Sequence, residues 1–298
     1  MPTVASFVSQ QATITAVLGC TSKLGFRMLP LPAGFWLALI AGGAGGDTQV
    51  VRGTGEWATG FFQEEAFGGI DTAGAAVVPG LALSGAIALA GIRRDGVPPQ
   101  AELWRSTDTG ATWAFAQELV GAGVGNLRPY AITFLSNGDV IAGLGQTEPR
   151  LWRSATPNMG AGGSWVDEGI WGGVAVAELI FDLLEIPGSG GTVIALLCTE
   201  LPVLGFKTRT IYTSTGFGAA AQTLRFTSAA TGLCTSQNMA LFRNATTGTL
   251  LASLAMSAGD SIARSTDGGV TWALVAGTPG AGGRFVLNGT QILCSVSS

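Results

Sequence analysis

The sequence predicts an all-β chain folded as a six-bladed β-propeller of four-stranded antiparallel blades. Three observations support this prediction: a nine-residue pattern occurs twice, apolar strand-like runs recur along the chain, and 46 of the 298 residues are glycine. The runs begin roughly every 40 to 57 residues, which is the length of one four-stranded blade. No change in composition separates a second part, so we expect a single domain over residues 1–298.

The repeated pattern is Arg-Ser-x-Asp-x-Gly-x-Thr-Trp, and its two copies begin at Arg105 and Arg264. The short Ser and Asp side chains can bond nearby backbone N–H groups and hold a turn, while glycine supplies the positive φ that such turns need. Thr and Trp then begin the next strand. The residues to which we assign this structural role are Ser106, Asp108, Gly110, Thr112, Trp113, Ser265, Asp267, Gly269, Thr271 and Trp272.

This pattern resembles the Asp-box, or BNR repeat, of sialidase-like β-propellers. In that family the turn joins the third and fourth strands of a blade and lies away from the ligand face. The resemblance therefore implies that the motif is structural and that any ligand site lies on the opposite loops. In character the chain is most similar to the non-catalytic propellers of bacteriophage tails and receptor-binding proteins.

Weaker copies of the hairpin begin near Val50, Leu151 and Thr210, without the Asp of the motif. An apolar strand precedes each hairpin, and a sixth such strand stands near the end of the chain. We expect these strands at 35–40, 86–90, 139–142, 192–197, 249–254 and 290–294.

The last apolar strand has no hairpin after it, whereas residues 5–10 and 12–17 form two alternating strand patterns. We therefore expect a shared sixth blade, with inner strands from the C-terminus and outer strands from the N-terminus. Such closure removes exposed sheet edges. The expected blades span about 20–66, 67–120, 121–170, 171–230, 231–279, and 280–298 together with 1–19.

Composition excludes several classes of function. The chain has no histidine, which excludes Ser-His-Asp and Cys-His catalysis and imidazole metal ligands. Its four cysteines form no CxxC pair, and its net charge of −4 offers no basic surface for nucleic acid. The uncharged runs 28–46 and 72–92 contain proline and several glycines, so we interpret them as buried hairpins, not membrane spans. We expect no metal and no cofactor.

Several polar and aromatic residues fall on loops that enter a first strand or join a second strand to a third. In a four-stranded propeller these loops form the ligand face. The residues predicted to bind a ligand there are Arg27, Asp47, Arg93, Arg94, Arg128, Tyr130 and Trp171. We interpret four nearby acidic residues as solvated loop charges, namely Glu64, Glu65, Asp167 and Glu168, although a two-carboxylate glycosidase pair remains open.

The run from Phe26 to Pro30 is similar to the Phe-Arg-Ile-Pro opening of sialidases. That resemblance implies that Arg27 grips a sugar carboxylate, which suits a planar guanidinium, and that Asp47 serves as acid/base. The family also needs a tyrosine nucleophile in the last blade, where this chain has Phe285. The departure counts against sialidase chemistry.

We therefore expect a non-catalytic structural or adhesive module of a virion, with neighbouring subunits and a cell-surface glycan as partners. Only 11% of the residues are charged, which suits a surface covered by other subunits. Two alternatives remain: a sialidase-like glycoside hydrolase, and an intracellular scaffold for protein assembly. The expected location is a virion or an extracellular surface, with the cytoplasm as the alternative.

Overall fold

A computed structural model of the chain is nearly all β. It describes residues 23–31, 35–42, 47–54, 61–70, 80–94, 100–119, 128–145, 149–155, 165–172, 178–189, 191–200, 207–217, 221–228, 239–254, 261–278, 285–288 and 291–294. Over these ranges no helix has the length and apolar character needed to cross a membrane.

Most of the described strands form antiparallel sets of four that pair in chain order, and we call these sets units one to five. Units three and four are joined into one eight-stranded sheet. Unit one contains β1 (Lys23–Pro30), β2 (Phe35–Gly42), β3 (Asp47–Thr54) and β4 (Phe61–Ile70). Unit two contains β5 (Leu81–Ser84), β6 (Ile87–Arg94), β7 (Gln100–Ser106) and β8 (Ala114–Leu119). Unit three contains β9 (Arg128–Phe134), β10 (Val140–Gly145), β11 (Arg150–Ser154) and β12 (Trp165–Ile170).

Units four and five continue the same order. Unit four contains β13 (Glu178–Glu185), β14 (Val193–Glu200), β15 (Lys207–Ser214) and β16 (Gln222–Thr227). Unit five contains β17 (Ala240–Arg243), β18 (Leu250–Ser253), β19 (Ile262–Ser265) and β20 (Ala273–Leu274). A final hairpin pairs β21 (Phe285–Asn288) with β22 (Gln291–Cys294).

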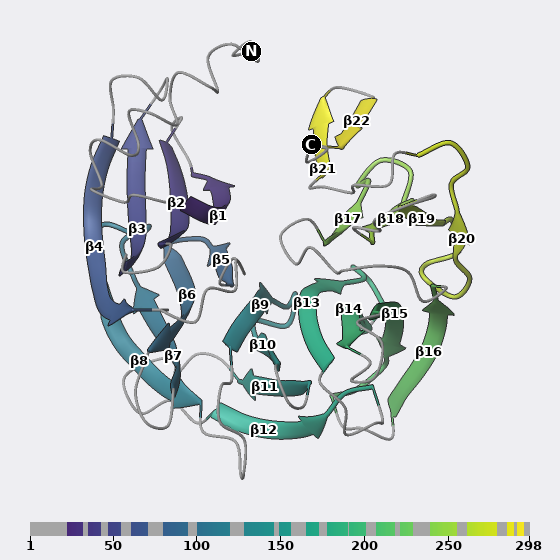
Figure 1. The fold of residues 1–298 in the computed structure, drawn as a ribbon, viewed down its shortest axis with the longest axis horizontal. Helices are drawn as coiled ribbons and strands as arrows, with labels where there is room; N and C mark the ends of the chain where they lie inside the picture. The colour runs from purple at the N-terminus through teal and green to yellow at the C-terminus, as the bar shows by residue number, and fades with distance from the viewer. Residues whose placement is uncertain are drawn as a thin grey trace.

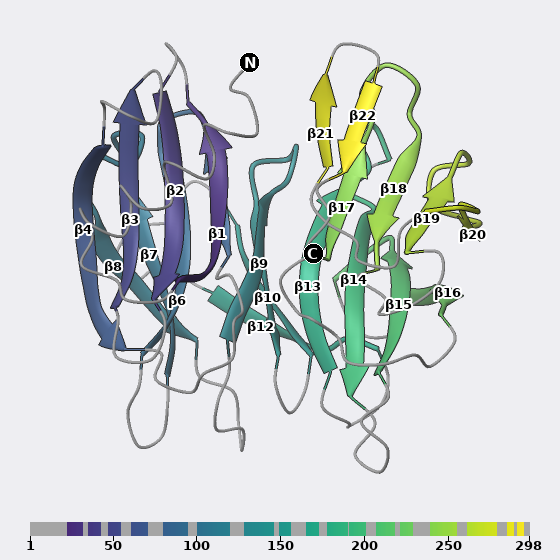
Figure 2. The ribbon, with the colours of Figure 1, turned by 45° about the horizontal axis from the view of Figure 1, so that its top comes forward.

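The units are arranged around a common centre (Figure 1). The first strand of each unit lies innermost and the fourth lies outermost, and the β21–β22 hairpin lies between unit five and unit one. Figure 2 shows the inner strands β1, β9, β13 and β17 in a view turned by 45°. The prediction of an all-β chain is confirmed, and the strands of each unit pair antiparallel as expected.

The core lies between neighbouring units. Separate buried clusters join units one and two, two and three, three and four, and four and five. Second strands are apolar on both faces because each is covered from both sides, and every residue of β10 is buried. Outer strands are covered less, so β12 and β16 mix polar and apolar side chains.

The predicted apolar strands correspond to β2, β6, β10, β14, β18 and β22, within a residue or two at their starts. One boundary is displaced, because the blade end expected near residue 66 falls inside β4. The two N-terminal strands expected at 5–10 and 12–17 lie outside the described residues. The number of blades and the shared sixth blade therefore remain predictions.

Candidate functional site

The first copy of the repeated motif folds into a closely hydrogen-bonded turn between β7 and β8. The Ser106 hydroxyl donates to Asp108 Oδ1 at 2.7 Å and accepts the Gly110 N–H at 2.8 Å. Asp108 Oδ1 also accepts the N–H groups of Ala111 and Thr112 at 3.0 and 2.8 Å. The Thr112 hydroxyl donates to the other carboxylate oxygen at 2.6 Å.

The second copy, between β19 and β20, repeats this network. The Ser265 hydroxyl lies 2.8 Å from Asp267 Oδ1 and accepts the Gly269 N–H at 2.9 Å. Asp267 Oδ1 accepts the N–H groups of Val270 and Thr271 at 3.1 and 3.0 Å, and the Thr271 hydroxyl donates to Oδ2. The same sequence pattern thus produces the same turn at two distant places.

The tryptophan that ends each motif closes its turn. Trp113 Nε1 donates to the Gly110 carbonyl at 3.1 Å, and Trp272 Nε1 donates to the Gly269 carbonyl at 3.0 Å. Each indole is partly buried, so its N–H finds a partner inside the turn while its ring packs beside the neighbouring strands.

Both turns also press against the preceding unit. A Cβ at Gly110 would stand 2.6 Å from Leu37 Cδ1 in unit one, and one at Gly269 would stand 3.1 Å from Ile194 Cδ1 in unit four. Arg52 of unit one extends Nη2 to 3.5 Å from the Thr109 hydroxyl. The motif therefore fastens its own hairpin and packs it against a neighbour.

The hydrogen bonds of the turn stabilise the ionised carboxylates. Burial by itself raises the pKa of Asp108, but the hydrogen bonds from Thr112, Ser106 and Ala111 outweigh it and lower the pKa to about 2. Hydrogen bonds from Thr271, above all, hold the pKa of Asp267 well below its usual range. Both groups stay charged at neutral pH and act as hydrogen-bond acceptors, not as proton donors.

Four of the seven residues predicted to bind a ligand lie at strand ends. Asp47 begins β3, Arg93 and Arg94 end β6, and Arg128 begins β9. Arg27 lies within β1, where it pairs with Leu39. These positions put most of the set at the rim where first strands begin and second strands end, opposite the motif turns.

At the rim, unit three pairs directly with unit four. Gly145, at the end of β10, pairs with Arg128 of β9 on one side and with Leu179 of β13 on the other. Arg128 and Leu179, which follows Glu178 at the start of β13, therefore lie on either side of Gly145. Glu178 was missed from the sequence, although its place at the start of a first strand is the signal that could have identified it.

Tyr130 occupies a special position in the same rim. It is the extra residue of a β-bulge, because Ala131 and Pro129 on either side of it pair with consecutive residues of β10. Phe181 of β13 is the extra residue of the corresponding bulge in unit four. Bulges of this kind re-aim side chains and are common at rims and beside active sites.

Trp171 does not lie on an open ligand face. Its side chain is fully buried, and its indole N–H donates to the Phe217 carbonyl at 3.1 Å in the turn between β15 and β16. The next residue, Gly172, is held by the Gln222 amide oxygen and the Tyr212 hydroxyl, at 2.9 Å each. This segment packs the end of unit three under the outer hairpin of unit four.

Asp167 and Glu168 are not solvated loop charges, contrary to the sequence interpretation. Both lie in β12, where Arg150 reaches Asp167 at 2.5 Å and Arg153 Nε donates to Glu168 at 2.6 Å. Arg153 also contacts Asp139 at 3.1 Å. The sequence alone did not indicate these ion pairs, because the arginines and the carboxylates come from different segments of the chain. Glu64 and Glu65 likewise belong to a strand, β4.

Two described aromatic residues, Tyr212 and Phe285, are engaged in other contacts. The Tyr212 hydroxyl is bonded to the Gly172 carbonyl, and Phe285 packs on Phe242 with ring centroids 5.8 Å apart. Within the described ranges, no three Cys, Asp or Glu residues are grouped to hold a metal ion.

Comparison with solved structures shows which fold this is. An α-L-arabinanase from Penicillium chrysogenum in complex with arabinobiose matches with a TM-score of 0.57 and 13% identity, over 85% of this chain and 81% of that one. An α-L-arabinofuranosidase from Fusarium graminearum with an iminosugar inhibitor matches with a TM-score of 0.55 and 12% identity, over 92% and 88%. A Trypanosoma rangeli sialidase with the inhibitor DANA matches with a TM-score of 0.58 and 12% identity, and 92% of this chain spans 53% of it.

Sequence comparison adds no relative. No protein-family model matches the chain, and no curated protein matches it. The structural likeness shows that the chain shares the propeller fold of these proteins, which confirms the fold implied by the resemblance to Asp-box proteins.

The same likeness corrects the expected function. We expected a non-catalytic module of a bacteriophage virion, but the three similar structures described above are an arabinanase, an arabinofuranosidase and a sialidase. The sequence pattern misled because the Asp-box is a folding motif that says nothing of the opposite loops. Virion location and likeness to phage-tail propellers have no support in these comparisons.

Proposed function

We propose that this chain is a sialidase-like propeller hydrolase that acts on glycosides. The observation that carries the proposal is the fold shared with the arabinanase over more than four fifths of both chains. The arabinofuranosidase and the sialidase extend the likeness to a second and a third glycoside-acting enzyme. The described rim, where inner strands begin, is the proposed location of the site.

The chain has no histidine, and we assign the chemistry to carboxyl groups. Most glycoside hydrolases use two Asp or Glu residues, one as acid and the other as nucleophile or base. We assign these roles to Asp47 and Glu178, which begin β3 and β13 at strand ends. This assignment replaces the tyrosine-based chemistry of sialidases, because this chain has Phe285 where the nucleophilic tyrosine is expected.

The substrate would be held by the other residues of the rim. Arg128 and Tyr130 begin the strand next to Glu178, and Arg93 and Arg94 end β6. Guanidinium groups and an aromatic ring suit sugar hydroxyls, carboxylates and ring faces. Arg27, five residues into β1, completes the proposed set.

The proposed fold that supports this site is a ring of six blades. Its last blade would combine β21 and β22 with strands from residues 5–10 and 12–17. The packing of Phe285 on Phe242 joins β21 to unit five and supports the first half of this arrangement. A closed ring would hold the starts of the inner strands in fixed positions around one centre.

The test is hydrolysis of a panel of aryl glycosides that contains an α-L-arabinofuranoside and a sialoside. The wild-type chain should release the aryl group from at least one of them. Asp47→Asn and Glu178→Gln should each lower kcat/KM by at least about a hundredfold, as loss of an acid–base group does. Glu185→Gln is the matched control, because Glu185 ends the same strand as Glu178 and binds Ser136 at 2.7 Å.

The control should retain wild-type kcat/KM even where it lowers the melting temperature. Absence of turnover on the whole panel, or full activity in both Asp47→Asn and Glu178→Gln, would overturn the proposal. Arg128→Ala should raise KM more than it lowers kcat if Arg128 holds substrate.

A further inference from the structure

Three arginines occupy the same place in units one, two and three. Arg52, Arg105 and Arg153 each lie on the third strand, opposite an apolar residue of the second strand. In each unit the fourth strand then carries one extra residue at the same register step. The extra residues of these bulges are Glu64, Ala116 and Glu168.

Unit three shows what this position does when a carboxylate is present. Glu168 accepts a hydrogen bond from Arg153 Nε at 2.6 Å, and Asp139 accepts a second from Nη1 at 3.1 Å. The hydrogen bond to Glu168 raises the pKa of the Arg153 guanidinium. The charge of the arginine is thus neutralised within its own unit.

Unit two has the arginine but neither carboxylate. Ala116 is the extra residue of its bulge, as Glu168 is in unit three. Ile87 lies two residues before the partner of Arg105, as Asp139 lies two residues before the partner of Arg153. Arg105 Nε is shielded from solvent and has no hydrogen-bond partner. Such a donor costs free energy until an acceptor reaches it, and the cost is greater for a charged group.

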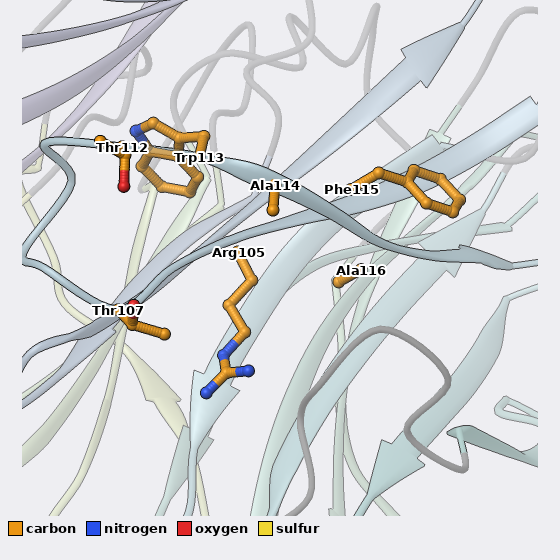
Figure 3. Close-up of a pocket in the computed structure, with 7 residues that line it drawn as sticks. All are labelled: Arg105, Thr107, Thr112, Trp113, Ala114, Phe115 and Ala116. Atoms are coloured by element: carbon orange, nitrogen blue, oxygen red, sulfur yellow. The ribbon is translucent and has the colours of Figure 1, made fainter.

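A pocket lies where the missing carboxylate would be. It has a volume of about 150 Å³, and Arg105 and Ala116 line it together with Thr107, Trp113 and Phe115. Figure 3 shows the Arg105 side chain extending between Thr107 and Ala116, with Phe115 on β8 and Trp113 just before it. The volume is below that of pockets for drug-sized ligands, so it suits a single small group.

We propose that this pocket binds the carboxylate of a small acidic sugar, with Arg105 as the counter-ion. The ligand carboxylate would take the place that Glu168 takes in unit three, because the edge of an arginine that carries Nε can donate hydrogen bonds to a carboxylate. Phe115 is 45% exposed and offers an apolar surface against which a sugar ring can pack. The Thr107 hydroxyl can bond a ring hydroxyl.

This site is separate from the proposed hydrolytic rim. Arg105 adjoins the motif turn that begins at Ser106, whereas Arg93 and Arg94 of the same unit stand at the opposite end of their strands. The pocket would therefore hold an acidic sugar without turning it over, as a second attachment point on the other side of unit two.

Arg52 and Arg264 occupy the same register in units one and five but differ from Arg105. Arg52 contacts the Thr109 hydroxyl of unit two through Nη2. Arg264 pairs with Leu251, as Arg105 pairs with Leu89, and its side chain is exposed to solvent. Arg264 therefore offers a matched control for removal of one arginine charge.

The experiment measures binding by calorimetry and by ligand-observed NMR, with glucuronate, glucose and acetate as probes. Glucuronate should bind the wild-type chain, glucose should not, and acetate should bind more weakly and compete with glucuronate. Arg105→Gln and Ala116→Glu should each weaken glucuronate binding about tenfold or more, the first by removing the donor and the second by supplying an internal carboxylate. Arg264→Gln should bind as the wild type does.

Ala116→Glu keeps the test decisive if Arg105→Gln folds poorly, since it recreates the pairing of unit three and should keep or raise the melting temperature. Equal binding of glucose and glucuronate would overturn the carboxylate assignment, and binding of acetate without glucuronate would overturn the sugar. Unchanged affinity in Ala116→Glu, or no binding of any probe, would overturn the site itself. None of these readouts depends on hydrolysis, so the proposed function can fail separately.

Discussion

The Ser106 hydroxyl donates to Asp108 Oδ1 at 2.7 Å, and the equivalent pair recurs far along the chain in the second copy of the motif. In both copies the serine also accepts the N–H of the motif glycine, and the aspartate accepts two further backbone N–H groups. Removing either side chain would leave several donors without acceptors at once.

The ionised aspartates make stability depend on pH in the acid range. The pKa of Asp108 is about 2 in the folded chain, below the roughly 3.9 of an unfolded aspartate. Its contribution is complete above about pH 4 and is lost as pH falls through about 2. Urea unfolding between pH 5 and 2 should show this loss, and it should shrink in Asp108→Asn, whose side chain does not titrate. An equally steep slope in the variant would contradict the assignment.

Substitution of Gly110 should cost more than substitution of Gly268. Both have a positive φ, of 85° and 73°, so alanine strains the backbone at each. A Cβ at Gly110 would also stand 2.6 Å from Leu37 Cδ1, whereas one at Gly268 meets nothing within 4 Å. We expect Gly110→Ala to lower the free energy of unfolding by about 1 to 3 kcal/mol more than Gly268→Ala. Equal losses of unfolding free energy in chemical denaturation would show that the Leu37 side chain moves aside without cost.

Arg209 should be a strong link between units four and five. It is fully buried, and Nε donates to the Leu254 carbonyl at 2.9 Å. Arg209→Met keeps the stem but leaves that carbonyl without this donor, so the free energy of unfolding should fall by about 1 to 3 kcal/mol. The control, Arg264→Met, changes an exposed arginine and should stay within about 0.5 kcal/mol of the wild type.

Glu168→Ala should give the bulge of unit three the alanine that Ala116 provides in unit two. Arg153 Nε would lose its partner at 2.6 Å, although Asp139 would still accept from Nη1. The melting temperature should fall by a few degrees, and added acetate should restore part of it. Chloride at the same ionic strength should not do so. Restoration by both salts alike would indicate general screening instead of occupation of the vacated place.

Closure of the ring can be tested by truncation. If residues 5–10 and 12–17 complete a shared blade with β21 and β22, deletion of residues 1–18 should expose a sheet edge and lower the melting temperature sharply. Replacement of Phe285 by alanine should weaken the same region, because it removes the contact with Phe242. An unchanged melting temperature in the truncated chain would rule out the shared blade.

Much of the fold could be predicted because it depends on local patterns. The motif turns are held by residues that lie within nine positions of one another, because the hydrogen bonds of the Ser, Asp and Thr side chains close inside that segment. The second strands could be located because burial on both faces demands continuous apolar runs. The length of the repeat then indicated a propeller.

The candidate sites were harder to predict, since they depend on which strands become neighbours. Trp171 and Glu168 were both expected near solvent, yet one is buried under the outer hairpin of the next unit and the other is bonded to Arg153. A bulge shifts register by one residue, and no local pattern announces where it occurs. The position of Ala116 in the same pocket as Arg105 is a consequence of such a shift.

The sequence by itself determined the repeating strands, the two motif turns and the exclusion of histidine chemistry, because each follows from residue type or from contacts within a short segment. Only the tertiary structure decided that Gly145 joins Arg128 to the start of β13, and that Arg105 faces a pocket where Arg153 has a carboxylate. Those relations span different strands or units, and they exist only once the strands have paired and the units have packed.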